Sequence, residues 1–410
     1  MDIQKVNRLF AETAYIRTGG SPEELKCAEY LKEECAKLGG EAYLESFEVD
    51  MATVKKAKLI IDGEEIPCTG YFLVGTHDVE GPFYYLTNTD AYSLSECKGK
   101  IVLFDGYVGY WKYQDILEAG AVGFITHDGN INFVDEDIDQ REVRAQIHRG
   151  NKIPGVHINT KKAVELVAKG VKNARIELEQ DEYPGTSHNV ILDLPGECPE
   201  YIALTAHYDS MPLSQGAYDN MSGCVGLLGL VKRFAKKPHK YGLRFIWCGS
   251  EERGLLGSKA YVSAHEEELG DIVLNVNLDM IGSIMGNFIA CCTTDEKVVH
   301  YLQYLGQIEG FGIKAYQDVY SSDSTPFADK GVPAISFARI APGNTESHHN
   351  AYDTAKQLSA SQMLADIEFI GTFVENMVNA EKLPIARELP DNVKEKLDYY
   401  MCRKRNPNTL

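Results

Sequence analysis

The sequence predicts an α/β protein with a doubly wound, mostly parallel sheet and an inserted β-rich domain. After about residue 185, apolar runs rich in Val, Ile and Leu alternate with helical patterns, as a parallel sheet covered on both faces requires. Between about residues 55 and 180, short strands separated by turn residues indicate a compact module with its own core. We therefore expect one discontinuous domain over residues 1–53 and 181–410, and an inserted domain over residues 54–180.

The amino-terminal residues predict two helices, at about 2–16 and 21–38. The second begins Ser21-Pro22-Glu23-Glu24, where the serine can cap the helix, the proline suits the first turn, and the acids face the positive end of the helix dipole. It ends at Gly39-Gly40, and a strand-like segment follows at 41–49. We expect these elements to form a supporting outer layer.

The remaining elements follow in two groups. In the inserted module, strands are expected at 57–63, 83–88, 99–106, 121–129, 153–159 and 174–180. After Tyr183-Pro184-Gly185, strands are expected at 189–196, 201–207, 243–250, 271–279, 287–292 and 333–339. Helices are expected at about 220–236, 254–264, 298–309 and 359–379, and a mixed-charge tail ends the chain.

The charge balance excludes several partners. The chain has 41 Lys and Arg against 60 Asp and Glu, a net charge of −19, so neither nucleic acid nor an anionic membrane is an expected partner. No secretory signal and no membrane-spanning run is evident, and the ten cysteines contain no CxxC pair. We expect a cytoplasmic protein with reduced thiols; whether it is a monomer or a homo-oligomer is not predicted.

Imidazoles and carboxylates recur where predicted strands end. In an open α/β sheet, functional groups gather at the carboxyl ends of the strands. Taken singly, each residue has a structural explanation as a helix cap, a first-turn acid or a hydrogen-bonded histidine. Together they would concentrate negative charge, which a bound dication neutralises. These residues are His207, Asp209, Asp219, Glu251, Glu252, Asp279, His348, His349 and Asp353.

Histidine and carboxylate without thiolate favour zinc or a similar first-row dication. Two ions about 3.5–4 Å apart need one bridging carboxylate and two terminal groups each. Glu251 is then available as general base, and Asp209 can orient the His207 ring. The residues that satisfy this ligand count are His207, Asp219, Glu252, Asp279 and His349.

Five ordered motifs resemble the M28 zinc peptidases, a family that includes bacterial leucine aminopeptidases and glutamate carboxypeptidases. They are ALTAHYDS (203–210), GAYDNMSG (216–223), GSEERGLLGS (249–258), NLDMIGS (277–283) and HNAYDT (349–354). The resemblance covers nearly all of the chain outside the middle module, and it implies the zinc exopeptidase fold and a peptide substrate.

The resemblance also implies roles for individual residues. His207 and Asp279 would bind one zinc ion, Glu252 and His349 the other, and Asp219 would bridge them. Glu251 would deprotonate a metal-bound water and pass the proton to the leaving amine. His349 is chosen because the family histidine lies four residues before the Asp of the final DT, here Asp353, which leaves the role of His348 open.

The middle module resembles a protease-associated (PA) domain in GKIVLFDG, ILEAGAVGFITHDG and IPGVHIN. This resemblance implies that the module lines one side of the active-site cleft and supplies no metal ligand. Its histidines, His77, His127, His148 and His157, are therefore expected to be structural or solvated.

Three positions near the motifs leave roles open. Ser322-Asp323-Ser324 stands where many members of the family have Ser-Asp-His. Tyr320 and Arg339 would either shape the substrate pocket and steady an oxyanion, or serve only in packing.

The leading hypothesis is a dinuclear zinc aminopeptidase that releases N-terminal residues from peptides. The first alternative is a carboxypeptidase or dipeptidase on the same site. A glutaminyl cyclase, which keeps a Glu-Glu pair but uses one zinc, is less favoured because of Asn220 and the inserted module. A non-catalytic scaffold would typically have lost ligands, and here none is missing. The residue that is cleaved is not predicted, because loops form the specificity pocket.

Overall fold

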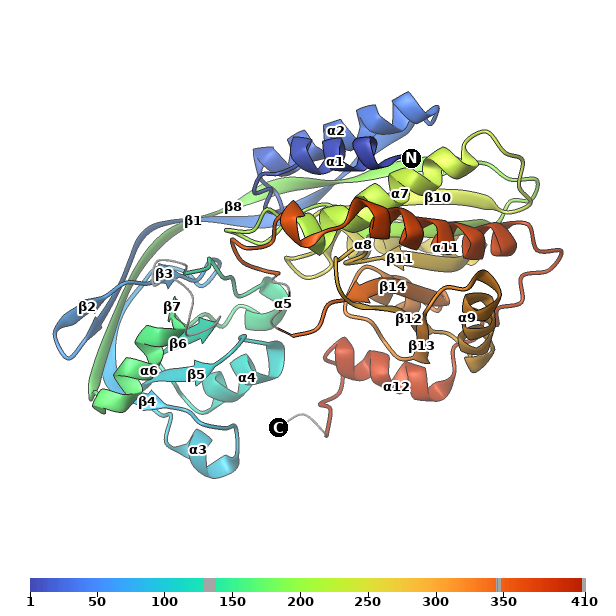
Figure 1. Cartoon of the computed structure of the whole chain (residues 1–410). Coiled ribbons are helices and arrows are strands. Elements are labelled where there is room, and N and C mark those ends of the chain that lie inside the picture. The colour runs from blue at the N-terminus through green and yellow to red at the C-terminus, as the bar shows by residue number, and fades with distance from the viewer. Residues whose placement is uncertain (129–137, 344, 346–347, 408–410) are drawn as a thin grey trace. The chain divides into compact units, whose positions relative to one another are not determined.

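The computed structural model describes residues 1–128, 138–343, 345 and 348–407. It divides into two compact units (Figure 1). Unit 1 comprises Met1–Glu48 and Thr186–Arg403, and unit 2 comprises Val49–Gly185 and Lys404–Leu410. These boundaries lie within a few residues of the predicted domain limits, except that the end of the chain groups with unit 2. There Arg405 forms an ion pair with Asp115.

Two long strands replace four of the predicted short ones. The segments expected at 41–49 and 57–63 belong to one strand, β1 (Ala42–Ile61), and those at 174–180 and 189–196 belong to β8 (Asn173–Leu194). The prediction of separate strands on either side of Tyr183-Pro184-Gly185 was wrong, because these three residues lie inside β8. β1 and β8 pair with each other, so the ladder continues through these residues.

Unit 1 is built on a central sheet with strand order β13-β12-β14-β11-β9-β10-β8. The inner strands β14, β11, β9 and β10 are parallel, whereas β8 and β12 run antiparallel to their inner neighbours. The bounds are β9 Tyr201–His207, β10 Gly242–Cys248, β11 Ile272–Leu278, β12 Asn287–Thr293, β13 Lys314–Gln317 and β14 Ala334–Ile340. The predicted α/β fold with a mostly parallel central sheet is thus confirmed.

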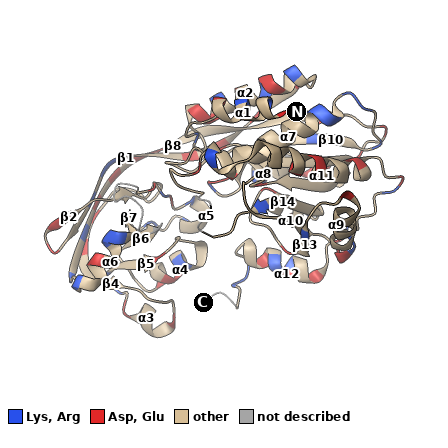
Figure 2. Ribbon diagram, viewed as in Figure 1, with Lys and Arg blue, Asp and Glu red and all other residues tan. Residues whose placement is uncertain are grey.

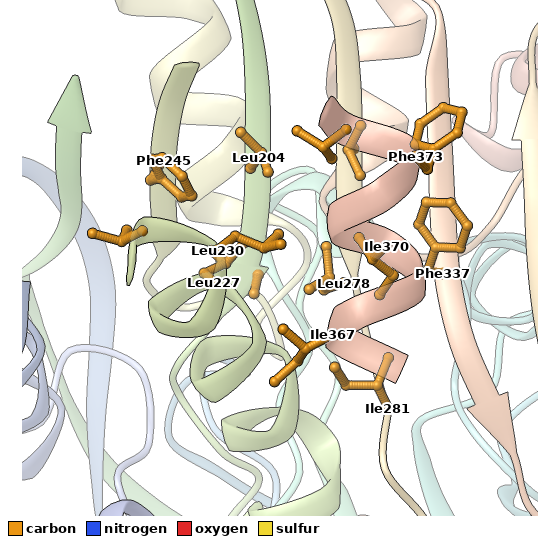
Figure 3. Packing of buried hydrophobic residues seen from close by; sticks show 14 of the residues in the cluster. Leu204, Leu227, Leu230, Phe245, Leu278, Ile281, Phe337, Ile367, Ile370 and Phe373 are labelled. Carbon is orange, nitrogen blue, oxygen red and sulfur yellow. The ribbon is translucent and has the colours of Figure 1, made fainter. Parts of the chain in front are cut away.

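Helices cover both faces of this sheet. On one face, α7 and α11 pack apolar side chains onto the strands. Leu227 of α7 and Ile370 of α11 share a buried cluster with Leu204 and Leu278, and Phe373 of α11 lies edge-on to Phe337 of β14 (Figure 3). The helices are α1 Ile3–Glu12, α2 Pro22–Leu38, α7 Ser222–Phe234, α8 Leu256–Ala264, α9 Glu296–Glu309, α10 Ser324–Asp329, α11 Ala360–Val378 and α12 Asp391–Tyr400, with short turns at Ala217–Met221, Glu266–Asp271 and Ala355–Gln357. The helices α10 and α12, and the strand β13 of the central sheet, were not predicted from the sequence.

The signals that predict α2 have their expected structural roles. The Ser21 hydroxyl accepts a hydrogen bond from the Glu24 amide, and Pro22 occupies the first turn. Gly39 ends the helix with φ 93°, a left-handed conformation that glycine adopts without strain.

Unit 2 has a core of its own, with strands β4, β5, β6 and β7 in parallel. Its elements are β2 Glu64–Ile66, β3 Thr69–Gly70, β4 His77–Tyr85, β5 Ile101–Asp105, β6 Gly123–Asp128 and β7 Gly155–Asn159, with α3 Ala91–Ser95, α4 Tyr110–Glu118, α5 Ala145–His148 and α6 Thr160–Lys169. Residue 129, the last of the strand predicted at 121–129, lies outside the described residues. The PA-like identity of this unit stays a prediction.

The four histidines of unit 2 all contact protein groups. A ring nitrogen of His77 lies 2.6 Å from the Val74 carbonyl oxygen, and His157 Nδ1 lies 2.8 Å from Thr126 Oγ1. His127 contacts Asp105 and Thr160, and His148 Nδ1 accepts a hydrogen bond from the Gly150 amide.

Charged residues of both signs are interspersed on α2 and α12 and also occur along β1, β2 and β8, whereas the central strands of unit 1 carry few (Figure 2). All ten cysteines are free, seven of them buried. Within the described ranges, no helix has the length and apolarity needed to cross a bilayer.

Candidate metal centre

Parallel pairing brings the predicted site residues to one edge of the sheet. His207 is the last residue of β9 and pairs in register with Cys248, the last residue of β10. Glu251 and Glu252 follow β10 after a turn, and Asp279 follows β11, which is the other neighbour of β9. The three strands therefore place their following residues side by side.

Two groups of donor atoms form at this edge and share Asp219. One contains His207, Asp219 and Asp279; the other contains Asp219, Glu252 and His349; within each group the donor atoms lie within 4.8 Å of one another. Asp219 Oδ1 lies 3.0 Å from His207 Nε2, and Asp219 Oδ2 lies 3.0 Å from His349 Nε2. Each oxygen of one carboxylate thus faces a different histidine, as a bridging ligand would.

Glu251 lies beside both groups. Its Oε2 atom is 3.7 Å from His207 Nε2, and Glu251, His207 and Glu252 form a third cluster of donors within 4.8 Å. Burial, and then the charges of Glu252, Asp323 and Asp279, raise the pKa of Glu251 well above its usual value, against the opposing effect of His207. The distances from Glu251 to these donors place its carboxyl close enough to act on a molecule held between the two groups.

The donor chemistry and electrostatics of the centre fit zinc. Asp279 Oδ1 is buried without a hydrogen-bond partner, a state that costs free energy unless a cation compensates. Burial, and then the charge of Asp219, raise the pKa of Glu252 above its usual value. For His207, burial by itself would lower the pKa, but the surrounding carboxylates outweigh this effect and raise the pKa. Imidazole and carboxylate donors in such a cluster suit zinc, whose positive charge would relieve this repulsion.

Asp209 contacts two parts of the centre. Its Oδ1 atom lies 3.4 Å from His207 Nδ1, the ring nitrogen that faces away from Asp219. The same carboxylate accepts hydrogen bonds from the backbone N–H groups of Glu251, at 2.9 Å, and Glu252, at 3.2 Å. The second contact was not predicted from the sequence.

Asp353 and Asn220 hold the turn that carries Asp219. The Asp353 carboxylate accepts hydrogen bonds from the amides of Tyr218 and Asp219, at 2.8 and 3.1 Å. The Asn220 side chain donates to the Leu278 carbonyl and accepts from the Met280 amide. The peptide bond between Asp219 and Asn220 is cis. The hydrogen bonds of Asn220 thus connect the beginning of α7 to the end of β11.

The segment between α1 and α2 also reaches the centre, so describing the first elements only as an outer layer was incomplete. Arg17 is fully buried. Its guanidinium donates to the carbonyl oxygens of Tyr208, Gln215 and Gly216, which flank His207 and Asp219 in the sequence. Glu24 contacts the turn before Glu251. A single sequence gives no signal for these contacts, because nothing in the spacing of Arg17 or Glu24 identifies a distant carbonyl or amide.

The residues whose roles the sequence left undecided lie in different environments. Arg339 pairs with Asp366 through two nitrogens and donates to the Gly286 carbonyl, which is a packing role rather than an oxyanion contact. The Tyr320 hydroxyl is buried without a hydrogen-bond partner; burial, and then the charges of Asp279 and Asp219, raise its pKa. Ser324 bonds Ser336, Asp323 is fully buried, and the His348 ring packs edge-on against His349.

Comparison with known proteins places this centre in a family. The model described as Peptidase family M28 matches residues 189–373, the stretch that contains every predicted ligand. Aminopeptidase YwaD of Bacillus subtilis is 28% identical over 306 residues, which cover 71% of this chain and 65% of that protein. Leupeptin-inactivating enzyme 1 of Streptomyces exfoliatus is 34% identical over 161 residues, or 36% of this chain and 35% of that protein. The chain therefore spans less than two thirds of the length of either curated relative.

Solved structures match over a larger share of the chain. The zinc aminopeptidase BSAP from Bacillus subtilis superposes with a TM-score of 0.77 at 25% identity, covering 96% of this chain and 99% of that one. The aminopeptidase from Aneurinibacillus sp. strain AM-1 shares the fold, with a TM-score of 0.75 at 23% identity over 94% and 96% of the two chains. With the ligand-bearing strands matched by the family and the fold matched over nearly the whole chain, this protein belongs to peptidase family M28.

Proposed function

We propose that the chain is a dinuclear zinc aminopeptidase that removes N-terminal residues from peptides. The observation that carries this proposal is the pair of donor groups that share Asp219, with Glu251 beside both. His207 and Asp279 would hold one zinc ion, Glu252 and His349 the other, and Asp219 both. The relatives named as aminopeptidases support the assignment.

Bound zinc would supply a Lewis acid for the scissile carbonyl and lower the pKa of the attacking water. Glu251 would act as general base, taking a proton from that water and delivering it to the leaving amine. Its buried carboxyl suits the first of these steps, because burial increases its proton affinity. Asp209 would keep the His207 ring in position through the contact at Nδ1.

Tyr320 would act as a hydrogen-bond donor to the substrate. Its hydroxyl has no hydrogen-bond partner, although it is buried near Asp279 and Asp219. A donor in this state can bond the carbonyl oxygen of the substrate as negative charge develops there.

The charges of the centre favour an aminopeptidase over a carboxypeptidase. A free amino terminus is a cation, and the five carboxylates of the centre outnumber the four positive charges that two zinc ions would bring. These carboxylates are Asp209, Asp219, Glu251, Glu252 and Asp279. A carboxypeptidase needs a cation for the terminal carboxylate, but Arg339, the residue the sequence suggested near the site, is held by Asp366.

Paired peptides test the proposal directly. One peptide is offered with free ends, with an acetylated amino terminus and with an amidated carboxyl terminus, each with zinc and with chelator, and the products are identified by mass spectrometry. We expect cleavage of the free and amidated peptides with zinc, and none after acetylation or chelation. Cleavage that survives acetylation but not amidation would indicate a carboxypeptidase, and a pyroglutamyl product from an N-terminal glutamine peptide would indicate a cyclase. Failure of the purified protein to bind zinc would revive the non-catalytic scaffold.

A further inference from the structure

Three consecutive backbone N–H groups after β10 donate to two buried carboxylates. The Ser250 amide donates to Glu24 Oε1 at 2.8 Å, and the amides of Glu251 and Glu252 donate to the two oxygens of Asp209. Glu24 comes from the first turn of α2, more than 200 residues earlier in the chain. We propose that Glu24 is a positioning residue for Glu251, an inference that rests on the function proposed above.

The turn that Glu24 holds is strained. Ser250 is fully buried and has φ 52°, in the left-handed region that serine rarely adopts. Such a conformation persists only where surrounding contacts hold it. Glu24 supplies two of these contacts, because its Oε1 atom accepts from both the amide and the hydroxyl of Ser250. The direction in which Glu251 leaves the turn therefore depends on Glu24.

Glu24 is itself fixed at both carboxyl oxygens. Its side chain is buried, with the residue 1% exposed. Oε2 accepts from the Gly20 amide at 2.7 Å, and Oε1 also accepts from the Ser187 hydroxyl at 2.9 Å. The carboxyl thus joins the beginning of α2, the strand β8 and the turn after β10.

Glutamine cannot reproduce this arrangement. Both oxygens receive a backbone N–H, one from Gly20 and one from Ser250, and an amide nitrogen accepts no hydrogen bond. Whichever way the amide is oriented, Glu24→Gln leaves one of these donors facing another donor. A shift of about 1 Å in a catalytic group can reduce the rate about 100-fold, so the turn need move only slightly to impair catalysis.

Glu34 offers a matched control. It lies on the same helix and is also fully buried, but it pairs with Lys5 and Lys37. It is ten residues further along α2, which is about 15 Å along the helix axis. Glu34→Gln therefore makes the same chemical change in the same helix without touching the turn after β10.

The test compares Glu24→Gln and Glu34→Gln with the wild type as full-length, zinc-loaded proteins. For Glu24→Gln we expect kcat to fall about 10- to 100-fold with KM changed by less than about threefold and zinc retained. In the metal-free protein, amide hydrogens of the turn at residues 249–252 should exchange faster in Glu24→Gln and at the wild-type rate in Glu34→Gln. A kcat for Glu24→Gln equal to that of the wild type or of Glu34→Gln would overturn the inference.

Two further outcomes are distinguishable. If Glu24→Gln does not fold, Ser187→Ala removes one of the contacts to Glu24 Oε1 and should lower kcat by a smaller factor; an unchanged kcat would then overturn the inference. If Glu251→Gln keeps full turnover, the proposed function fails. If Glu251→Gln is inactive while Glu24→Gln is fully active, only the positioning role of Glu24 fails.

Discussion

Asp219→Asn gives the sharpest test of a two-ion centre. Each Asp219 oxygen lies 3.0 Å from a different histidine, so the substitution removes one oxygen donor from only one of the two groups. An amide nitrogen is a poor ligand because its lone pair is delocalised. Losing a group that merely supports a ligand lowers metal affinity about 10- to 100-fold, so losing a direct ligand should cost at least about 100-fold, or about 2.7 kcal/mol.

The measurement is zinc content after dialysis against buffered zinc. We expect about two ions per chain in the wild type and about one in Asp219→Asn. Asp193→Asn is the control: it makes the same change at a carboxylate that pairs with Arg244, and it should retain two ions. If Asp219→Asn binds two ions as tightly as the wild type, Asp219 does not bridge them, and the shared-ligand interpretation is refuted.

Three further predictions concern stability. Arg17→Met leaves buried carbonyls without donors and should lower the free energy of unfolding in urea by about 3–5 kcal/mol; a loss below about 1 kcal/mol would contradict the role of Arg17. Burial raises the pKa of Asp323 to about 7, above its unfolded value, so between these values the folded state holds one proton more and stability falls as pH rises. Relative to Asp323→Asn, the free energy of unfolding of the metal-free wild type should therefore fall by about 2 kcal/mol between pH 5 and 7; the same pH dependence in both proteins would disprove this. Finally, zinc at 100 times its Kd adds about 2.7 kcal/mol per site, so chelation should lower Tm by at least about 5 °C, whereas an unchanged Tm would argue against bound metal.

The inner strands and the position of the centre were predictable because they depend on local patterns. The apolar runs at 201–207 and 271–279 end in a histidine or an aspartate, and the run at 243–250 is followed directly by two glutamates. Parallel strands place such residues at one edge of the sheet. The unbroken strands β1 and β8 were not predictable. Their mutual pairing keeps Tyr183-Pro184-Gly185 extended where local preferences favour a turn.

The supporting contacts of the centre could not be read from the sequence either. Ser21 and Glu24 carry the signal of a helix start, and that signal was correct. It accounts for the amide that Ser21 caps, but it does not say where the Glu24 carboxyl points. The contact between Glu24 and Ser250 depends on how α2 packs within unit 1, which is a tertiary property.

Glu251→Gln tests the central claim most directly, with zinc content and hydrolysis of a peptide with a free amino terminus measured on the same preparation. The substitution keeps the shape of the side chain but removes its ability to accept a proton. We predict that the variant retains about two zinc ions and loses turnover by a factor of about 100 or more. A Glu251→Gln protein that hydrolyses the peptide at the wild-type rate would contradict the account.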